Sequence, residues 1–250
     1  MRLYLKAIPL EAEVIAKIVE SIEAAEHVCK DELASFDCPT DNGNDGMCWN
    51  FINREIIRVL EGGRFQKTVM RRGIWKLIGI YDKQTKYFYT LMRNKTFNNL
   101  RKNASKKLMH YMNALSRLNS NLSEEYDLLE EQLILGEEFS LGKTYLAKLD
   151  DVLGVLLKDI VGDINAYALI SFDMHDGQVC QLEGIIPSVG MNCFARENWT
   201  EYIGVASESS TVASRIEANC TFDDADNIAD GNGEPLLRRK RKNNKLQSRC

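Results

Sequence analysis

Apolar residues recur every three or four positions in two stretches near the start of the chain, and this spacing predicts amphipathic helices. The first stretch covers residues 9–30, with Pro9 in the first turn and Glu11 close behind, where the helix dipole favours a carboxylate. The second stretch, "WNFINREIIRVLEGG" (residues 49–63), ends in two glycines, which commonly terminate helices. Between them, "FDCPTDNGNDGM" is dense in turn-forming residues and predicts a loop.

The pattern changes over residues 64–93, which are rich in aromatic and β-branched side chains. The segments "RFQKTVM", "GIWKLIGIY" and "KYFYTLM" predict a meander of three antiparallel strands, with "DKQTK" as a turn. The middle segment is apolar at both odd and even positions, for example at Ile78 and Ile80 and at Leu77 and Tyr81. We therefore expect this strand to be covered on both faces.

The remaining periodic segments alternate between helix and hairpin patterns. Residues 95–119 carry one apolar stripe at helical spacing, and "SEEYDLLEEQLI" and "TYLAKLDDVLGVLLKDI" extend helical or mixed structure to residue 160. The runs "AYALISFD" and "QVCQLEGII" flank "MHDG", and the Asp-Gly pair is a strong hairpin signal. Residues 191–220 show no single helix or strand pattern, although "ENWTEYIGV" within them is amphipathic.

These elements predict an α+β fold in which an antiparallel β-meander and hairpins pack against several helices. Residues 1–220 are expected to form one folded region, and a subdivision near residues 120–140 stays open. Residues 221–250 are acidic and then strongly basic, which is typical of a disordered charged tail. The chain contains two segments in which helices are followed by a hairpin, and this order leaves open the possibility of a weak internal duplication.

The composition favours a cytoplasmic protein. Hydrophobic residues make up 44% and charged residues 27% of the 250-residue chain, and no run of apolar residues is long enough to cross a membrane. The first residues lack the features of a signal peptide. The 7 cysteines are odd in number and scattered, so we expect reduced thiols and not a disulfide framework.

Charge is strongly segregated along the chain, although the formal net charge is only −4. Residues 51–120 hold sixteen basic and three acidic residues, whereas residues 121–237 hold five basic and twenty-three acidic ones. The last thirteen residues hold seven basic residues and no acidic one. This asymmetry favours an anionic partner for the basic segments.

Three motifs that suggest chemistry are incomplete. The segment "GEEFSLGKTY" ends like a phosphate-binding loop, but five residues separate Gly136 from Gly142 where the motif has four, and two acids would face the phosphate. A zinc site at His27, Cys29, Cys38 and Cys48 would require two residues only two positions apart on a helix to reach one ion. The alternative to the phosphate-binding loop is a turn between two helices, and the alternative to the zinc site is a set of buried thiols beside a surface histidine. The sequence predicts no cofactor and no metal.

A metal-dependent nuclease, the third of these motifs, is the second functional hypothesis. Asp173 and Glu183 would face each other across the predicted second hairpin and could hold a magnesium ion. However, Ile185 occupies the position where a catalytic lysine would be expected. An ordinary hairpin with polar residues near its turn explains the same pattern.

The leading hypothesis is a nucleic-acid-associated binding or regulatory protein. Residues 64–117 interleave cations with aromatic residues, so that cations could neutralise phosphates while exposed rings stack on bases. The basic tail resembles nucleic-acid-binding arms. The residues expected to make contact are Arg64, Lys67, Arg71, Arg72, Trp75, Lys102, Lys106, Arg238, Arg239, Lys240 and Arg241.

Two alternatives concern the acidic segment. It could fold over the basic block and cancel its charge within one domain. It could also make the chain a protein–protein interaction module with no affinity for nucleic acid, including a homo-oligomer held by acidic and basic segments. No membrane partner is expected.

Overall fold

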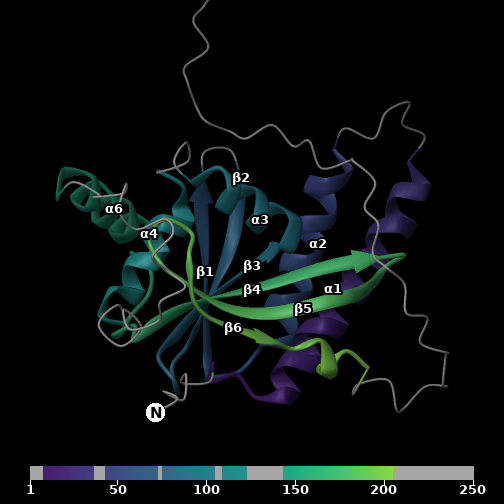
Figure 1. Cartoon of the computed structure of the whole chain (residues 1–250). Coiled ribbons are helices and arrows are strands. Elements are labelled where there is room, and N and C mark those ends of the chain that lie inside the picture. Colours follow the sequence, from purple (N-terminus) through teal and green to yellow (C-terminus); the bar gives the residue numbers. More distant parts are fainter. Residues whose placement is uncertain (1–7, 37–42, 73–74, 105–108, 123–142, 205–250) are drawn as a thin grey trace, which may run out of the picture.

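The computed structural model describes residues 8–36, 43–72, 75–104, 109–122 and 143–204 (Figure 1). The helices are α1 (Ala12–Ser35), α2 (Asn44–Val59), α3 (Asn94–Lys102), α4 (Tyr111–Ser116) and α6 (Lys143–Leu156), with short 3-10 helices η2 (Arg117–Leu122) and η4 (Thr200–Tyr202). The strands are β1 (Phe65–Arg72), β2 (Trp75–Asp82), β3 (Tyr87–Arg93), β4 (Ala166–His175), β5 (Gln178–Pro187) and β6 (Cys193–Asn198).

All six strands belong to one sheet in the order β1-β2-β3-β4-β5-β6. The first three strands form the predicted antiparallel meander, and β4, β5 and β6 form a second antiparallel unit. A parallel pairing of β3 with β4 joins the two units. The α+β fold class is therefore confirmed, and the two β elements expected from the sequence are halves of a single mixed sheet.

One face of the sheet packs against α1 and α2. The first core is built from the buried stripe of α1, including Ile15, Ile18 and Ile22, together with Ile52 and Ile56 of α2. Alternate residues of the strands complete this core, among them Ile78, Ile80, Tyr89, Ala168 and Ile170. In Figure 1 the two helices are seen to the right of β1, β2 and β3.

The opposite face packs against α3, α4 and α6. Phe97 and Leu100 of α3, Leu115 of α4 and Leu149 of α6 meet the other set of alternate strand residues, which includes Tyr81, Phe88 and Tyr167. Since helices lie on both faces, β3 and β4 are buried on both sides along most of their lengths. The same expectation for the middle meander strand holds for Ile78–Asp82 of β2, whereas Lys76 is exposed and Leu77 half-buried. The result is a three-layer arrangement of helices, sheet and helices (Figure 1).

The connection from β3 to β4 differs from the expected single helix over residues 95–119. Helix α3 ends at Lys102, and α4 begins after His110. His110 caps α4: its backbone is extended, and its ring Nδ1 accepts a hydrogen bond from the backbone amide of Met112. The apolar stripe survives this break because both helices face the second core. Buried Asn119 then fixes the connection to the sheet by hydrogen bonds with Tyr167 and the carbonyl of Pro187.

A disulfide joins α1 to α2 through Cys29 and Cys48, whose Cα atoms are 5.3 Å apart. The expectation of reduced thiols is therefore wrong for this pair, because the packing of the two helices brings cysteines nineteen positions apart into contact. The disulfide also removes two of the three sulfurs from the hypothetical zinc site, and the third, that of Cys38, lies outside the described residues. None of the helices in the described ranges is long and apolar enough to cross a membrane.

Candidate nucleic-acid interface

The β1–β2 hairpin continues beyond the part of the sheet that β3 supports. Strands β1 and β2 pair along their whole lengths, from Phe65 opposite Asp82 to Arg72 opposite Trp75. In contrast, β2 pairs with β3 only from Ile80 to Asp82. The other five residues of β2 and their partners in β1 therefore form a two-stranded ribbon, about 17 Å long at the usual rise per residue. In Figure 1, β1 runs upward and β2 returns beside it in the opposite direction.

Three cations lie on one face of this hairpin. Arg71 stands directly opposite Lys76, and Lys67 lies on the same face four residues before Arg71. Arg71 and Lys76 are exposed, and Lys67 is half-buried. Within the described ranges these three side chains make no ion pair. Val69, which lies between Lys67 and Arg71 on this face, is 56% exposed. We call these three cations the basic ribbon, in which Lys67, opposite Ile80, lies where the two-stranded part begins.

Arg64, at the other end of β1, has a structural role. Its guanidinium makes two hydrogen bonds with the carboxylate of Asp82, at 3.0 and 2.7 Å, and an ion pair of 2.8 Å with Glu11. Burial opposes ionisation of Asp82, but hydrogen bonds from Arg64 and from the Gln84 amide and Thr85 hydroxyl outweigh it and lower the pKa of this carboxyl. Arg64 is engaged at the base of the hairpin, so we do not include it in the basic ribbon.

Acidic residues from outside the basic block neutralise part of it. Arg64 pairs with Glu11, and Arg117 pairs with Asp150 at 2.8 Å. Arg93 lies 4.0 Å from Glu26 and stacks on the ring of Phe172. Of these three pairs, only Arg117–Asp150 joins the basic block to the acidic segment 121–237, because Glu11 and Glu26 precede the block. The basic ribbon has no such acidic neighbour in the described part of the chain.

The predicted contact residues do not form one surface. The register places the basic ribbon on the sheet face that carries α1 and α2, whereas α3, which carries exposed Lys102, packs on the opposite face. The backbones of Arg72 and Trp75 pair at the end of the hairpin, but their side chains lie outside the described set. The remaining predicted contacts, Lys106, Arg238, Arg239, Lys240 and Arg241, also lie outside the described residues, as do residues 136–142 of the phosphate-loop-like segment.

Lys76 is the cation that the predicted contact set lacked. Its importance comes from its register with Arg71, and a short hairpin connection between two strand patterns is the sequence signal that would have paired them.

The two carboxylates of the nuclease hypothesis lie on the same face of neighbouring strands. Ser171 pairs with Glu183, and Asp173 pairs with Gln181, so the two acids are diagonal neighbours across β4 and β5. Asp173 belongs to β4 and is buried against the first residues of α3. Burial raises the pKa of its carboxyl, although hydrogen bonds from the Asn94 side chain and from the backbone amides of Asn94 and Lys95 favour the charged form. Asp173 therefore acts on α3 as an acidic cap.

Glu183 is also engaged within the fold. One carboxylate oxygen of Glu183 accepts a hydrogen bond from the side-chain amide of Gln181 at 3.0 Å, and the other oxygen lies 3.3 Å from the guanidinium of Arg196. A cation at this position would be repelled by Arg196. In the described ranges, no three histidine, cysteine, aspartate or glutamate side chains are grouped to hold a metal ion.

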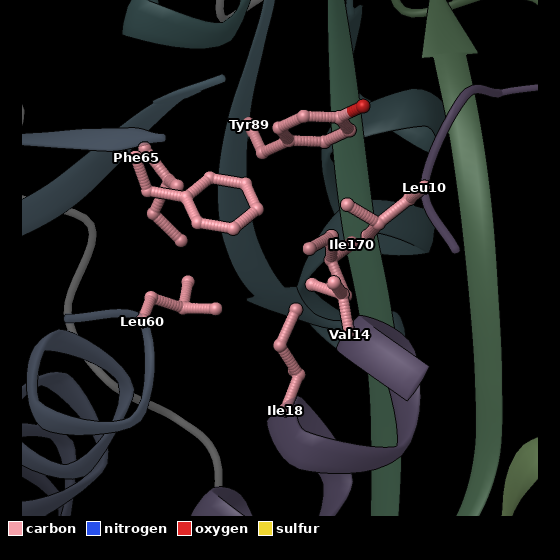
Figure 2. Close-up of a pocket in the computed structure, with 8 residues that line it drawn as sticks. Leu10, Val14, Ile18, Leu60, Phe65, Tyr89 and Ile170 are labelled. Carbon is pink, nitrogen blue, oxygen red and sulfur yellow. The ribbon is translucent and has the colours of Figure 1, made fainter. Parts of the chain in front are cut away.

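An apolar cavity lies in the first core between α1, the end of α2 and the sheet (Figure 2). Its lining consists of Leu10, Val14, Ile18, Leu60, Phe65, Ile80, Tyr89 and Ile170. Only Tyr89 contributes a polar group, and the cavity is too narrow for a water molecule. It is a packing gap and offers no groups that would orient a ligand.

The fold and the surface together define an α+β protein with a mixed six-stranded sheet and a cationic β-hairpin at one edge. The chain matches the model of a family of unknown function, DUF5986, over residues 7–249. Because the match covers nearly the whole chain, the protein belongs to this family. No curated protein and no solved structure matches the chain.

Proposed function

We propose that this protein binds nucleic acid through the basic ribbon, which contacts backbone phosphates. The observation that carries the proposal is the placement of Arg71 directly opposite Lys76 on an exposed face, with no ion pair to either side chain in the described ranges. Like charges directly opposite each other destabilise a hairpin, so this pairing has a cost in the free protein. A phosphate between the two side chains would turn that repulsion into attraction.

Protection of a sheet edge is the competing explanation. Strand β1 is the edge strand of the sheet, and lysine or arginine on an edge discourages pairing with another chain. Edge protection accounts for Lys67 and Arg71, and also for Lys76, because β2 pairs with β3 only from Ile80 to Asp82 and its outer side has no partner strand at Lys76. Edge protection does not account for the direct opposition of Arg71 and Lys76, since staggered cations would protect both edges without mutual repulsion, and this opposition favours a ligand-binding role for the basic ribbon.

The test is a charge-removal experiment on the full chain. In the variant Arg71→Gln/Lys76→Gln, the affinity for a labelled DNA oligonucleotide should fall roughly tenfold at low salt, and the slope of log affinity against log salt should flatten by about 2. Fluorescence anisotropy over a salt series measures both quantities. Circular dichroism and thermal unfolding establish that the variant is folded.

The matched control removes two cations from the other end of the same sheet. Lys83 and Lys86 are exposed in the turn between β2 and β3, so the variant Lys83→Gln/Lys86→Gln has the same loss of charge. We expect this control to change the affinity by less than about twofold, since long-range effects of exposed charges are screened by salt. Equal losses in the two variants would show that binding depends on net charge alone and would refute the basic ribbon as the site.

A further inference from the structure

The aromatic side chains of the basic block are used in the cores. Tyr81, Tyr87, Phe88, Tyr89, Phe97 and Tyr111 are all at least 92% buried. Phe51 and Phe65 are partly buried against the first core, and each lies under an arginine guanidinium, at 4.7 and 4.8 Å from the ring centroid. Among the described side chains of residues 51–120, none is therefore an exposed aromatic platform on which a base could stack.

Binding of single strands relies on such platforms. Proteins that bind single-stranded nucleic acid combine a cationic groove with aromatic rings that stack on successive bases. The basic ribbon presents the cations together with an aliphatic side chain, Val69, and no described ring. Its contribution to binding is accordingly electrostatic, and it acts through the phosphates.

A duplex is the better ligand for a surface of this kind. Its phosphates lie on the outside, its charge density is higher, and each phosphate that a protein neutralises releases more counterion from duplex DNA than from a single strand. A two-stranded ribbon also has the dimensions to enter the major groove of B-form DNA, which is about 12 Å wide. In this position Lys67, Arg71 and Lys76 would face phosphates along one wall of the groove.

We infer that the ligand of the basic ribbon is double-stranded DNA, whose backbone it contacts without base stacking. This inference rests on the function proposed above and specifies the form of the nucleic acid. Trp75 provides the critical comparison, because it pairs with Arg72 at the end of the hairpin and is the aromatic residue of β2 whose side chain lies outside the described set. A protein that binds single strands would need the Trp75 ring for stacking on bases, whereas a protein that binds only the backbone of a duplex would not.

The experiment compares a short DNA duplex with each of its separated strands, at the same salt concentration, for the full chain and its Trp75→Ala variant. We expect the duplex to bind roughly tenfold more tightly than either strand, in line with its higher charge density. We also expect Trp75→Ala to change the affinity for the duplex by less than about twofold, whereas loss of a stacking contact would cost roughly fivefold or more. If Trp75→Ala unfolds, Trp75→Leu retains apolar bulk and provides the same comparison.

The outcomes separate the two proposals. Single strands that bind as tightly as the duplex, with binding lost in the Trp75 variants, would overturn the duplex inference and leave nucleic-acid binding in place. Binding of the duplex that Arg71→Gln/Lys76→Gln leaves unchanged would refute the basic ribbon and with it this inference. Absence of binding to every oligonucleotide at low salt would refute both.

Discussion

Asp82 shows at the scale of one residue how the base of the hairpin is held. Its carboxylate is fully buried and accepts hydrogen bonds from Arg64, the Gln84 amide and the Thr85 hydroxyl. It thereby joins the start of β1 to the turn that follows β2. A buried ion pair contributes little net stability compared with apolar groups, but loss of one partner leaves the other charge buried and unpaired.

Replacement of Asp82 should therefore destabilise the protein in a manner that depends on pH. We expect Asp82→Asn to lower the free energy of unfolding by about 3 kcal/mol at neutral pH. Because folding lowers the pKa of Asp82, its contribution is present above the pKa of the unfolded carboxyl and is lost as the pH falls through the lower, folded pKa. Urea unfolding of both proteins over a pH series measures this difference, which should shrink as the solution becomes acidic.

The matched control is Asp150→Asn, which breaks a half-exposed ion pair with Arg117. Exposed pairs contribute less than about 1 kcal/mol, so this variant should stay close to the parent protein. A difference between parent and Asp82→Asn that stays constant from neutral to acidic pH would contradict an electrostatic role for Asp82.

Gly184 is a second residue whose identity is dictated by its neighbour. The indole of Trp199 lies over Gly184, and a β-carbon at this position would approach the ring to 2.3 Å. Trp199 is 3% exposed and belongs to the first core, so it cannot move away freely.

We expect Gly184→Ala to lower the free energy of unfolding by roughly 1–3 kcal/mol through overpacking. Gly154 lies on the exposed face of α6, where an added β-carbon would meet no other atom within 4 Å. Gly154→Ala should instead raise stability by roughly 0.5–1 kcal/mol, because alanine favours helix. Chemical denaturation of both variants measures the two effects. Destabilisation by both substitutions would show that the close approach of Trp199 is not the cause.

At the scale of elements, local patterns predicted much of this structure. Helical periodicity located α1, α2 and α6, and the strand patterns located the meander and the Asp-Gly hairpin. The parallel pairing of β3 with β4 could not be predicted, since both strands are apolar on both faces and nothing local specifies their partner. The break between α3 and α4 was missed because the apolar stripe continues across it.

The basic ribbon was predicted only in part, for a related reason. The predicted contact set included Lys67 and Arg71 but lacked Lys76. It also did not separate Arg64, which reaches Asp82 and Glu11, from Arg71, which is exposed. That difference depends on how far β3 extends along β2, which is a property of the assembled sheet. The sequence also did not show whether the aromatic residues of the basic block were exposed or buried. In the structure, the described ones lie in the cores or against them.

The disulfide is the other element-scale feature, and it ties the two helices of one layer together. Cys29 is fully buried in α1, and Cys48 lies in the first turns of α2. Cross-linking of positions nineteen residues apart restricts the unfolded chain between the helices.

Loss of this disulfide should lower the free energy of unfolding by about 3 kcal/mol, the value expected for a closed loop of this length. Cys29→Ala/Cys48→Ser removes the link, and urea unfolding under oxidising conditions compares it with the parent. A reductant should destabilise the parent protein and leave the double variant unchanged. Equal sensitivity of both proteins to the reductant would show that another cysteine pair is responsible.

At the scale of the whole molecule, the fold distributes charge unevenly over one sheet. Three acidic residues, Glu11, Glu26 and Asp150, reach Arg64, Arg93 and Arg117, and in the described ranges no ion pair reaches the cations of the basic ribbon. Part of the charge segregation along the sequence is thus neutralised, and one local group of positive charge lies at the β1–β2 edge of the sheet. This edge is where the proposed binding function can be tested with few substitutions.

The parallel seam between β3 and β4 also has a consequence for how the protein is made. Strand β3 is buried along nearly its whole length, yet its neighbour β4 begins at Ala166, after the entire connection that contains α3, α4 and α6. A ribosome therefore synthesises more than seventy residues after β3 before the partner strand emerges. During this interval β3 lacks its partner on one side, and an unpaired apolar strand edge is prone to association with other chains.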